Sequence, residues 1–303
     1  MTSRLRPATL LLAGLATAAL SLSACGSDSL NTDTGATGTQ EPAPSATANA
    51  ELAAKVPEKI KSAGKIVIGT DASYAPNEFL DTDGKTVVGM DVDLFNAVAQ
   101  QFGLEVEWVP ANFDSIIVGV QSGKFDVGVS SFTINDKRKE QVNMVSYFNA
   151  GTQWATAPGN PKKVDPNKPC GLTVAVQKGT VQEEEDLPAK VEACKTEGKP
   201  MTVQPYTGQD QATAAVASGK ADAMLADSPV VAYAVKQSGG KIEAAGDIYD
   251  AAPYGYVVPK DQADWAQAIA DALKAAEESG AYEAALTKWG TEDGAIDDFA
   301  VNP

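Results

Sequence analysis

The chain has no histidine, and this absence excludes several kinds of active site. Without imidazole there is no Ser-His-Asp or Cys-His nucleophile pair, no histidine ligand for a metal ion and no ordinary proton shuttle near neutral pH. Basic residues are also few: 24 Lys and Arg stand against 40 Asp and Glu, which gives a formal net charge of -16. Phosphates require a basic protein surface, so we expect no nucleic-acid partner. The same charge disfavours direct adhesion to an anionic membrane surface.

Aromatic residues are scarce as well, at 7% of 303 residues, whereas hydrophobic residues reach 44%. This composition fits an α/β interior built mostly from Val, Ile, Ala and Leu. The chain is longer than one hydrophobic core usually serves, so we expect one or two lobes.

The N-terminus has the order of a bacterial export signal. Arg4 and Arg6 precede an apolar run over residues 8–22, and the first acidic residue is Asp28. This pattern is typical of a signal peptide, here residues 1–24, rather than of a mature membrane span. The ending Leu-Ser-Ala-Cys resembles a lipobox, in which Cys25 is acylated and becomes the first mature residue. The alternative is an ordinary signal peptide, with Cys25 an unpaired thiol.

The segment after Cys25 is poor in large apolar side chains. Residues 26–50 are mainly Ser, Thr, Gly, Asp, Pro and Ala, and Leu30 is the only large apolar residue among them. Such a composition cannot offset the entropy lost on ordering, so we expect a disordered tether over residues 25–55. Stable anchoring requires more than one acyl chain on the cysteine. The expected location is the outer face of the cell membrane, with contact through the lipid anchor only.

The remaining two cysteines, Cys170 and Cys194, then lie in an oxidising environment. An even pair in such a compartment predicts a disulfide. A redox or metal-binding role is the weaker alternative, because 24 positions separate the two residues and no histidine accompanies them. We expect no metal site and no cofactor.

From residue 51 onward, short β-like apolar runs alternate with amphipathic helical stretches. Residues 65–69 have the pattern of a buried strand, and residues 91–102 place four large apolar side chains on one helical face. Further helix and strand patterns follow at 114–121 and 125–129. This order predicts an α/β fold with a mainly parallel sheet covered on both faces.

An internal repeat divides this region into two similar lobes. The segments 122–126 and 218–222 lie 96 positions apart, and each ends a predicted helix and begins a predicted strand. We therefore expect lobe 1 over residues 56–151 plus 257–303 and lobe 2 over residues 152–256. The chain crosses twice between them, so a two-stranded hinge is expected.

Ligands of open α/β sheets bind beyond the carboxyl ends of the strands. These positions hold Asp71, Tyr74 and residues 130–138 in lobe 1, and residues 177–181 and Asp227 in lobe 2. They include an arginine on one lobe and an aspartate on the other. A guanidinium pairs with a carboxylate and a carboxylate accepts from an ammonium group, so a cleft between them would suit a zwitterion.

At these residues the sequence resembles the family 3 solute-binding proteins of bacterial ABC transporters, the polar amino-acid group. The matching segments run in family order between residues 64 and 290: Gly69-Thr70-Asp71-Ala72-Ser73-Tyr74-Ala75-Pro76, Val88-Gly89-Met90-Asp91-Val92-Asp93-Leu94, Phe113-Asp114-Ser115-Ile116-Ile117, Ser130-Ser131-Phe132-Thr133-Ile134-Asn135-Asp136-Lys137-Arg138, Gln177-Lys178-Gly179-Thr180 and Asp222-Ala223-Met224-Leu225-Ala226-Asp227. The resemblance implies the two-lobed type II periplasmic-binding-protein fold, with each lobe a mainly parallel sheet flanked by helices.

The resemblance also implies a clamp for an α-carboxylate. Arg138 would bind the carboxylate, aided by the backbone or hydroxyl groups of Ser131, Thr133 and Thr180. Taken alone, Arg138 would more simply be a solvated residue at a helix start.

The other site residues implied by the resemblance hold the rest of the ligand. Asp227 would take the α-ammonium group, Tyr74 and Phe113 would sandwich the side chain, and Asp71 would lie near its polar end. Gln177 is compatible with a basic or an amide side chain. Each has a structural alternative: Asp227 could cap the helix that follows, Asp71 could cap a turn, and the two aromatic residues could belong to the core.

The implied function is that of an extracellular lipoprotein that captures a polar or basic L-amino acid by hinge closure. Glutamine, glutamate, arginine and related amino acids are the candidate ligands, and ABC permease subunits are the expected partners of a monomeric protein. Gln177 and Val181 depart from well-known family members, which leaves the substrate open. One alternative is an enzyme similar to cyclohexadienyl dehydratase, with Glu78, Lys178 or Glu183 as acid or base. The other is a ligand-sensing lipoprotein not coupled to transport; no catalytic residue is expected otherwise.

Overall fold

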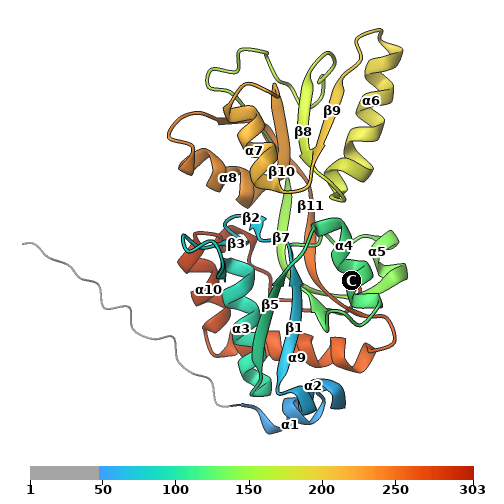
Figure 1. Cartoon of the computed structure of the whole chain (residues 1–303), viewed down its shortest axis with the longest axis vertical. Helices are drawn as coiled ribbons and strands as arrows, with labels where there is room; N and C mark the ends of the chain where they lie inside the picture. The colour runs from blue at the N-terminus through green and yellow to red at the C-terminus, as the bar shows by residue number, and fades with distance from the viewer. Residues whose placement is uncertain (1–47) are drawn as a thin grey trace, which may run out of the picture. The chain divides into compact units, whose positions relative to one another are not determined.

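The computed structural model describes residues 48–303, which belong to one compact unit (Figure 1). The predicted signal peptide, Cys25 and most of the predicted tether lie outside the described residues. The tether prediction is wrong for its last residues, because helix α1 (Ala50–Ala54) begins within it. The Asn49 side chain accepts hydrogen bonds from the N–H groups of Glu51 and Leu52, and Leu52 is buried against lobe 1. A cap and one buried leucine are enough to order this turn.

Lobe 1 is defined here as the elements that pack around strand β1. Its helices are α1, α2 (Glu58–Ala63), α3 (Met90–Phe102), α4 (Phe113–Gln121), α5 (Asp136–Gln141), α9 (Ala263–Glu278), α10 (Ala281–Trp289) and the 3-10 helix η2 (Glu292–Gly294). Its strands are β1 (Lys65–Thr70), β5 (Glu105–Pro110), β6 (Val127–Gly128) and a small separate sheet of β2 (Ser73–Tyr74), β3 (Glu78–Leu80) and β4 (Val87–Val88).

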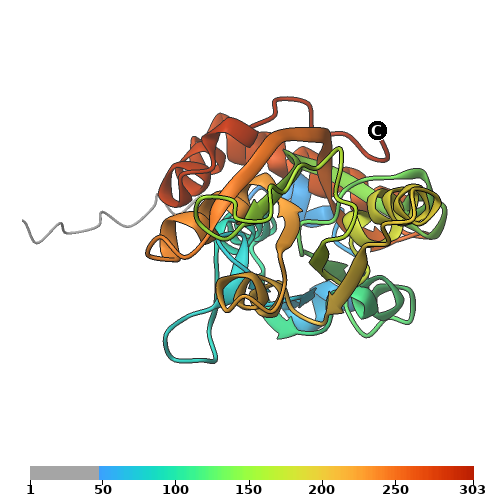
Figure 2. The same cartoon turned by 90° about the horizontal axis from the view of Figure 1, so that it is seen from above.

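Lobe 2 is defined as the elements that pack around strand β8. They are β8 (Thr173–Gln177), the π-helix η1 (Gln182–Asp186), α6 (Leu187–Thr196), β9 (Thr202–Tyr206), α7 (Gln209–Ala217), β10 (Ala223–Asp227) and α8 (Ser228–Gln237). Helix α6 lies on one side of the lobe 2 strands, and α7 and α8 lie on the other (Figures 1 and 2). Strand β10 is buried on both faces, as expected for a covered sheet.

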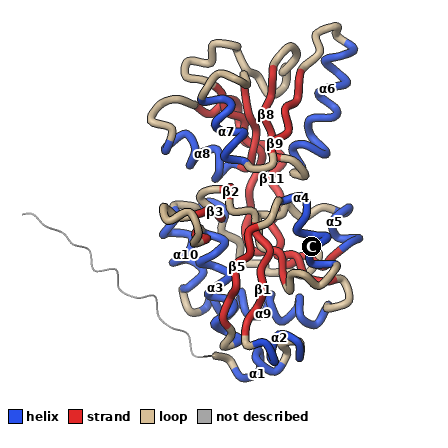
Figure 3. The backbone as a smooth tube through the Cα atoms, viewed as in Figure 1, coloured by secondary structure: helices blue, strands red, loops and turns tan. Residues whose placement is uncertain are grey.

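Two long strands, β7 (Val142–Thr156) and β11 (Glu243–Pro259), belong to both lobes. They join all the larger strands into one sheet of order β5-β1-β6-β11-β7-β10-β8-β9. Strand β1 pairs in parallel with β5 and β6, and β8 pairs in parallel with β9 and β10, whereas the two crossing strands are antiparallel to their neighbours. The fold is therefore mainly parallel within each lobe, and Figure 3 shows the crossing strands as the connection between the lobes.

The crossing strands are irregular where they pass between the lobes. Their register shifts between Ala245 and Tyr249 and again between Tyr249 and Ala252. At Gly151 an added Cβ would lie 2.6 Å from the Ile248 side chain and 2.7 Å from the Tyr249 carbonyl oxygen. A larger residue at this position would push the two strands apart, so the glycine permits their close crossing.

The repeated segments form the same turn in both lobes. Gly123 follows α4 and Gly219 follows α7, and both have a φ of +74°, in the left-handed region. The aspartate that ends each segment then accepts a hydrogen bond from the adjacent strand. Asp126 accepts from an N–H of β1 at 3.0 Å, and Asp222 accepts from an N–H of β8 at 2.8 Å. The 96-residue spacing thus marks two structurally equivalent helix-to-strand turns.

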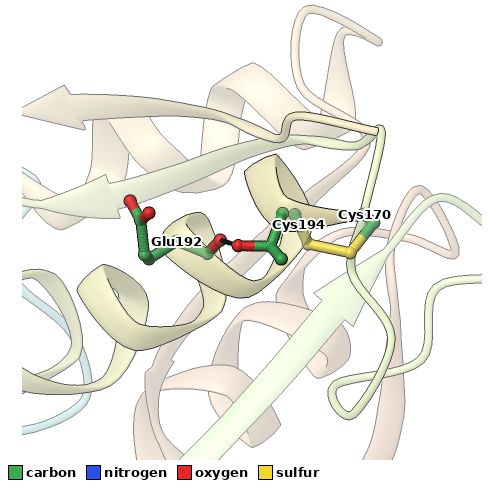
Figure 4. The surroundings of a disulfide bond; sticks show 4 residues. Cys170, Glu192 and Cys194 are labelled. Carbon is green, nitrogen blue, oxygen red and sulfur yellow. Dashed lines mark hydrogen bonds between the residues drawn. A yellow bond between two sulfur atoms is a disulfide. The ribbon is translucent and has the colours of Figure 1, made fainter. Parts of the chain in front are cut away.

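The disulfide predicted from the sequence is present between Cys170 and Cys194. It ties α6 to the segment before β8, and Figure 4 shows the bond on the same helix as Glu192. Cys194 is buried in a cluster of lobe 2 side chains from α6 and the sheet. Among the described helices, none has the length and hydropathy needed to cross a bilayer.

Candidate functional site

A small cavity lies where the two lobes meet. Its lining comes from the carboxyl ends of β1, β5, β6, β8 and β10 and from the segments that follow them. The lining residues are Tyr74, Phe113, Ser131, Thr133, Arg138, Gln177, Thr180, Val181, Gln182 and Asp227. Eight of the nine ligand-contact residues predicted from the sequence are among them. The structure therefore brings together residues from positions 74 to 227 at one site.

Arg138 projects from the short helix α5 in lobe 1 and is only 7% exposed. Asn135 caps this helix by accepting a hydrogen bond from the Arg138 N–H. The guanidinium donates through Nη1 to the Thr133 carbonyl oxygen at 2.7 Å and through Nη2 to the Gly179 carbonyl oxygen of lobe 2 at 3.1 Å. These neutral acceptors do not neutralise the guanidinium, and burial lowers the pKa of Arg138 from its usual range. A ligand carboxylate would supply the missing negative charge.

Asp227 ends strand β10 in lobe 2 and is 6% exposed. Its Oδ1 accepts from Gln182 Nε2 and its Oδ2 accepts from the Tyr254 hydroxyl, both at 2.7 Å. Burial raises the pKa of this carboxyl, while the donors and the nearby Arg138 charge oppose the rise. No side-chain cap of α8 is formed by Asp227. The carboxylate is thus positioned by neutral donors, and an ammonium group would compensate its charge.

Aromatic rings form one wall of the cavity. Phe113, the first residue of α4, stacks on Phe132 with the ring centroids 4.4 Å apart. The Arg138 guanidinium carbon lies 5.5 Å from the Phe113 centroid and 5.3 Å from that of Phe132. The Tyr74 hydroxyl accepts a hydrogen bond from the Asp227 N–H across the lobes. These rings restrict the arginine and offer flat surfaces to a ligand side chain.

The predicted hydroxyl contacts are arranged differently from one another. The Ser131 hydroxyl lies within hydrogen-bond distance of the buried carboxyl groups of Glu78 and Asp91, and it accepts from Asn77. The Thr180 hydroxyl donates to the Gln177 carbonyl oxygen at 2.8 Å. In this arrangement both hydroxyl hydrogens bond to protein groups, so neither is free to donate to a ligand.

Asp71 is the one predicted ligand contact that does not line the cavity. Its Oδ2 accepts from the Phe113 N–H at 2.9 Å, and its Oδ1 accepts from the Ser73 hydroxyl at 2.5 Å. The carboxylate therefore fixes the start of α4 and the turn after β1. This matches the structural alternative of a turn cap, and the prediction that Asp71 faces the ligand is not supported by this geometry.

Two lining residues, Val181 and Gln182, were not among the predicted contacts. Gln182 is 2% exposed and its Nε2 donates to both Asp227 Oδ1 and the Thr152 hydroxyl. The available signal was its place directly before the acidic run of η1, five residues beyond the end of β8. Gln177, at the end of β8, is buried and its Oε1 has no hydrogen-bond partner among the described residues. It is a ready acceptor for a ligand N–H.

Direct contacts close the two lobes around the cavity. Lys178 of lobe 2 pairs with Asp114 of lobe 1 at 2.7 Å, and Lys137 of lobe 1 pairs with Glu184 of lobe 2 at 2.5 Å. These exposed ion pairs lie on the side where α4 and α5 face the start of η1. Within residues 48–303, no group of three or more Cys, Asp or Glu residues is arranged to hold a metal ion.

Comparison with known proteins gives the same picture. Residues 66–292 match the family described as bacterial extracellular solute-binding proteins, family 3. The arginine-binding protein ArgT of Corynebacterium glutamicum is 39% identical over 253 residues, which cover 83% of each chain. The lysine/arginine/ornithine-binding periplasmic protein of Escherichia coli is 29% identical over 244 residues, which cover 78% of this chain and 89% of that protein.

Solved structures show the same fold. An ancestral arginine-binding protein bound to arginine is 32% identical, with a TM-score of 0.68, and covers 75% of this chain and 98% of its own. An ancestral amino acid-binding protein described as a precursor of cyclohexadienyl dehydratase is 33% identical, with a TM-score of 0.66, and covers 77% of this chain and 98% of its own.

Proposed function

Since the chain belongs to family 3 of the bacterial extracellular solute-binding proteins, we propose that it captures an L-amino acid between its lobes and delivers it to an ABC importer. One observation carries the proposal. A buried guanidinium of lobe 1 and a buried carboxylate of lobe 2 line the same small cavity, and neither forms an ion pair with a described residue. A zwitterionic amino acid would supply both missing charges.

Binding would couple the two lobes through the ligand. The α-carboxylate would pair with Arg138, and the α-ammonium group would replace the Gln182 donor at Asp227. The ligand side chain would lie along the ring of Phe113. Because each charged end engages a different lobe, the complete ligand stabilises the closed arrangement more than either end alone.

Arginine is the amino acid that we propose first. The C. glutamicum relative is named for arginine, and so is the solved ancestral structure. In this chain the free Oε1 of Gln177 could accept from a guanidinium or an amide, and the Phe113 ring could stack on a planar guanidinium. Glutamine is the second choice by the same reasoning.

The export signal and Cys25 support a place at the outer face of the membrane through a lipid anchor. The family description supports an extracellular location of the binding domain. We further propose a monomer, because one chain supplies both charged groups that the proposed ligand requires.

The test is a thermal-shift screen of the chain from residue 26 onward against L-arginine, L-lysine, L-ornithine, L-glutamine, L-glutamate and L-cystine. A ligand at 100 times its Kd adds about 2.7 kcal/mol to the free energy of unfolding. We expect a selective rise in Tm with L-arginine. If no amino acid raises Tm, and mass spectrometry of the denatured protein finds no copurified amino acid, the proposal fails.

The second candidate function is that of an enzyme acting on cyclic acids, because one solved relative is described as a precursor of cyclohexadienyl dehydratase. The three acid or base candidates do not line the cavity. Glu78 is buried beneath Ser131, Lys178 pairs with Asp114, and Glu183 accepts from the Gly179 N–H at 2.6 Å. We therefore propose binding without catalysis, and turnover of prephenate by the purified protein would contradict it.

Transport and sensing are separated by a different test, because both begin with the same binding step. We expect deletion of the gene to abolish high-affinity uptake of radiolabelled ligand by whole cells. Uptake equal to that of the parent strain would favour the sensing alternative.

A further inference from the structure

Two carboxyl groups, Glu78 of β3 and Asp91 of α3, are buried together in lobe 1 directly behind the ligand cavity. Both residues are 0% exposed, and neither lines the cavity. The backbone brings them together, because the Asp91 N–H donates to the Asn77 carbonyl oxygen at 2.9 Å. Burying two carboxylates side by side without compensation would be very costly.

The contacts of the pair show that its donors are few. Glu78 Oε1 accepts from the Ser130 hydroxyl at 3.0 Å. The Ser131 hydroxyl lies 3.2 Å from Glu78 Oε2 and 3.3 Å from Asp91 Oδ2. A hydroxyl has a single hydrogen to donate, so it can bond to only one of these two carboxyl groups at a time.

No positively charged side chain among the described residues pairs with Glu78 or Asp91, so two negative charges at this place would be uncompensated. Among residues 48–303, no Lys or Arg forms an ion pair with either carboxyl. The titratable groups that face the pair are Tyr147 of β7, Tyr256 of β11, Tyr74 of β2 and Asp71 after β1. All of them are neutral or negative near neutral pH.

The surroundings of the two carboxyl groups favour a negative charge on Asp91 rather than on Glu78. Asp91 accepts from the Tyr147 hydroxyl at 2.6 Å and from the Ser131 N–H at 3.0 Å. It also lies in the first turn of the 13-residue helix α3, where the helix dipole favours an anion. The groups that donate to Glu78 are hydroxyls only. Asp91 is therefore the better anion and Glu78 the better acid.

We propose that Glu78 stays protonated and shares its proton with the Asp91 carboxylate, and that this acid pair is a positioning device for the Ser130–Ser131 turn of the ligand site. The turn requires such support because Ser131 has a φ of +50°, a left-handed conformation that is costly for serine. The next residues are Phe132, which stacks on Phe113, and Thr133, whose carbonyl holds Arg138. A displaced turn would therefore also displace Arg138, the proposed partner of the ligand carboxylate.

The pKa directions agree with this geometry. Burial raises the pKa of Glu78 well above its usual range, and the Asp91 charge and the hydrogen bond between the two groups add to the rise. Burial also raises the pKa of Asp91, to about 6, against the hydrogen bonds from Tyr147, Glu78 and Ser131. Two carboxyl groups can hydrogen-bond to each other only when one carries a proton.

The sign of the pH dependence follows. The pKa of Glu78 is higher in the folded protein than in the unfolded chain, so the folded state holds more protons between the two values. The shared proton makes its full contribution to the free energy of unfolding at low pH. This contribution is lost as the pH rises through the pKa of Glu78 in the folded protein. A glutamine at position 78 keeps two N–H donors at every pH, so it removes this dependence.

The experiment compares wild type, Glu78→Gln and Glu78→Ala from residue 26 onward, with Glu105→Gln, an exposed carboxyl of β5, as the matched control. Tm is measured from pH 5 to pH 9 without ligand. We expect the Tm of Glu78→Gln minus that of wild type to rise steadily with pH, whereas Glu105→Gln follows wild type. Parallel curves for wild type and Glu78→Gln over the whole range would overturn the shared proton.

Infrared spectroscopy gives a direct readout that does not depend on folding energies. A wild-type minus Glu78→Gln difference spectrum at pH 7 should contain the carbonyl stretch of a protonated carboxylic acid, with a shift in D2O. Absence of that band would overturn the proposal even if Glu78→Ala fails to fold.

The effect on ligand affinity rests on the proposed function and is measured separately. We expect Glu78→Ala to weaken binding of L-arginine at least tenfold at pH 7, and Glu78→Gln to restore it to within threefold of wild type. Equal loss in both variants would overturn the positioning role. If no amino acid binds even to wild type, the proposed function fails while the Tm and infrared results still decide the shared proton.

Discussion

Lobe 1 and lobe 2 share one helix-to-strand plan but carry different side chains at equivalent positions of the cavity. Shifting the sequence by 96 residues aligns the two helix-to-strand turns, and it also sets Ser131 of lobe 1 beside Asp227 of lobe 2. Both residues follow or end a central strand at the cavity. Lobe 1 uses its position for a strained turn that supports Arg138, whereas lobe 2 places a carboxylate there directly. The two lobes therefore have the same glycine and aspartate at the helix-to-strand turns, where the backbone conformation requires them. They differ at positions 131 and 227, which line the cavity.

The two cores differ as well. The main core of lobe 1 contains many large aromatic side chains, among them Phe95, Tyr147 and Trp265. The core clusters of lobe 2 are built mostly from Ala, Val, Leu and Met, with Trp154 the only tryptophan. The Cys170–Cys194 disulfide belongs to the lobe with the less aromatic core. This suggests that lobe 2 depends on a covalent link where lobe 1 depends on packing.

The largest expected effect on ligand affinity comes from removing the charge contributed by lobe 1. Arg138→Ala should weaken amino-acid binding by at least about 2 kcal/mol, or roughly 30-fold, because the ligand carboxylate would be buried without a partner. Isothermal titration calorimetry measures the change. Lys139→Ala, the neighbouring cation outside the cavity, is the matched control and should bind as wild type. An Arg138→Ala affinity within threefold of wild type would contradict the clamp.

The disulfide of lobe 2 should affect stability rather than affinity. The double variant Cys170→Ser/Cys194→Ser should lose about 3 kcal/mol of unfolding free energy, since 24 positions separate the two cysteines. Urea unfolding measures the loss, and chemical reduction of wild type should reproduce it. Unchanged stability would mean that lobe 2 does not depend on the link.

The charge contributed by lobe 2 predicts a pH dependence. Burial raises the pKa of Asp227 without ligand, and a bound ammonium group would lower it again, so binding releases a proton. Affinity should therefore fall as pH drops through the raised pKa, by up to about tenfold per pH unit. Asp227→Asn should bind weakly but without this slope. Calorimetry in two buffers of different ionisation enthalpy detects the released proton, and its absence at acidic pH would contradict the assignment.

The smallest effect should come from the exposed contacts between the lobes. Lys178→Ala removes the ion pair with Asp114, which is solvent-exposed and therefore weak. We expect at most a few-fold faster ligand release in stopped-flow measurements, and no difference from wild type at high salt. The exchanged pair, Lys178→Asp with Asp114→Lys, should recover the wild-type rate. A large effect that persists in high salt would point to a different role for Lys178.

The sequence predicted best what depends on local pattern. The alternation of apolar runs located β1 and α3, and the repeat located the two equivalent turns. Two crossings between the lobes were expected, but the full length of the crossing strands β7 and β11 was not. These strands mix apolar, polar and glycine residues because they serve both lobes and the crossing between them.

Within the site, the sequence predicted which residues meet better than how they are oriented. Arg138 and Asp227 both reach the cavity because they lie just beyond strand ends. Asp71 also follows a strand, but its carboxylate accepts a hydrogen bond from the N–H of Phe113, 42 residues later in the chain. Gln182 was missed because its contact with Asp227 depends on the path of η1, which no local pattern specifies.

The central claim is that each lobe holds one charged end of the same amino acid. Titration calorimetry of wild type with the amino acid identified by the thermal-shift screen, its decarboxylated amine and its Nα-acetyl derivative tests this most directly. For arginine, these analogues are agmatine and Nα-acetyl-L-arginine. The account predicts that both analogues bind at least roughly 30-fold more weakly than the amino acid, because each leaves one buried charge unpaired. An analogue that binds as tightly as the amino acid would show that the corresponding lobe does not hold that end of the ligand.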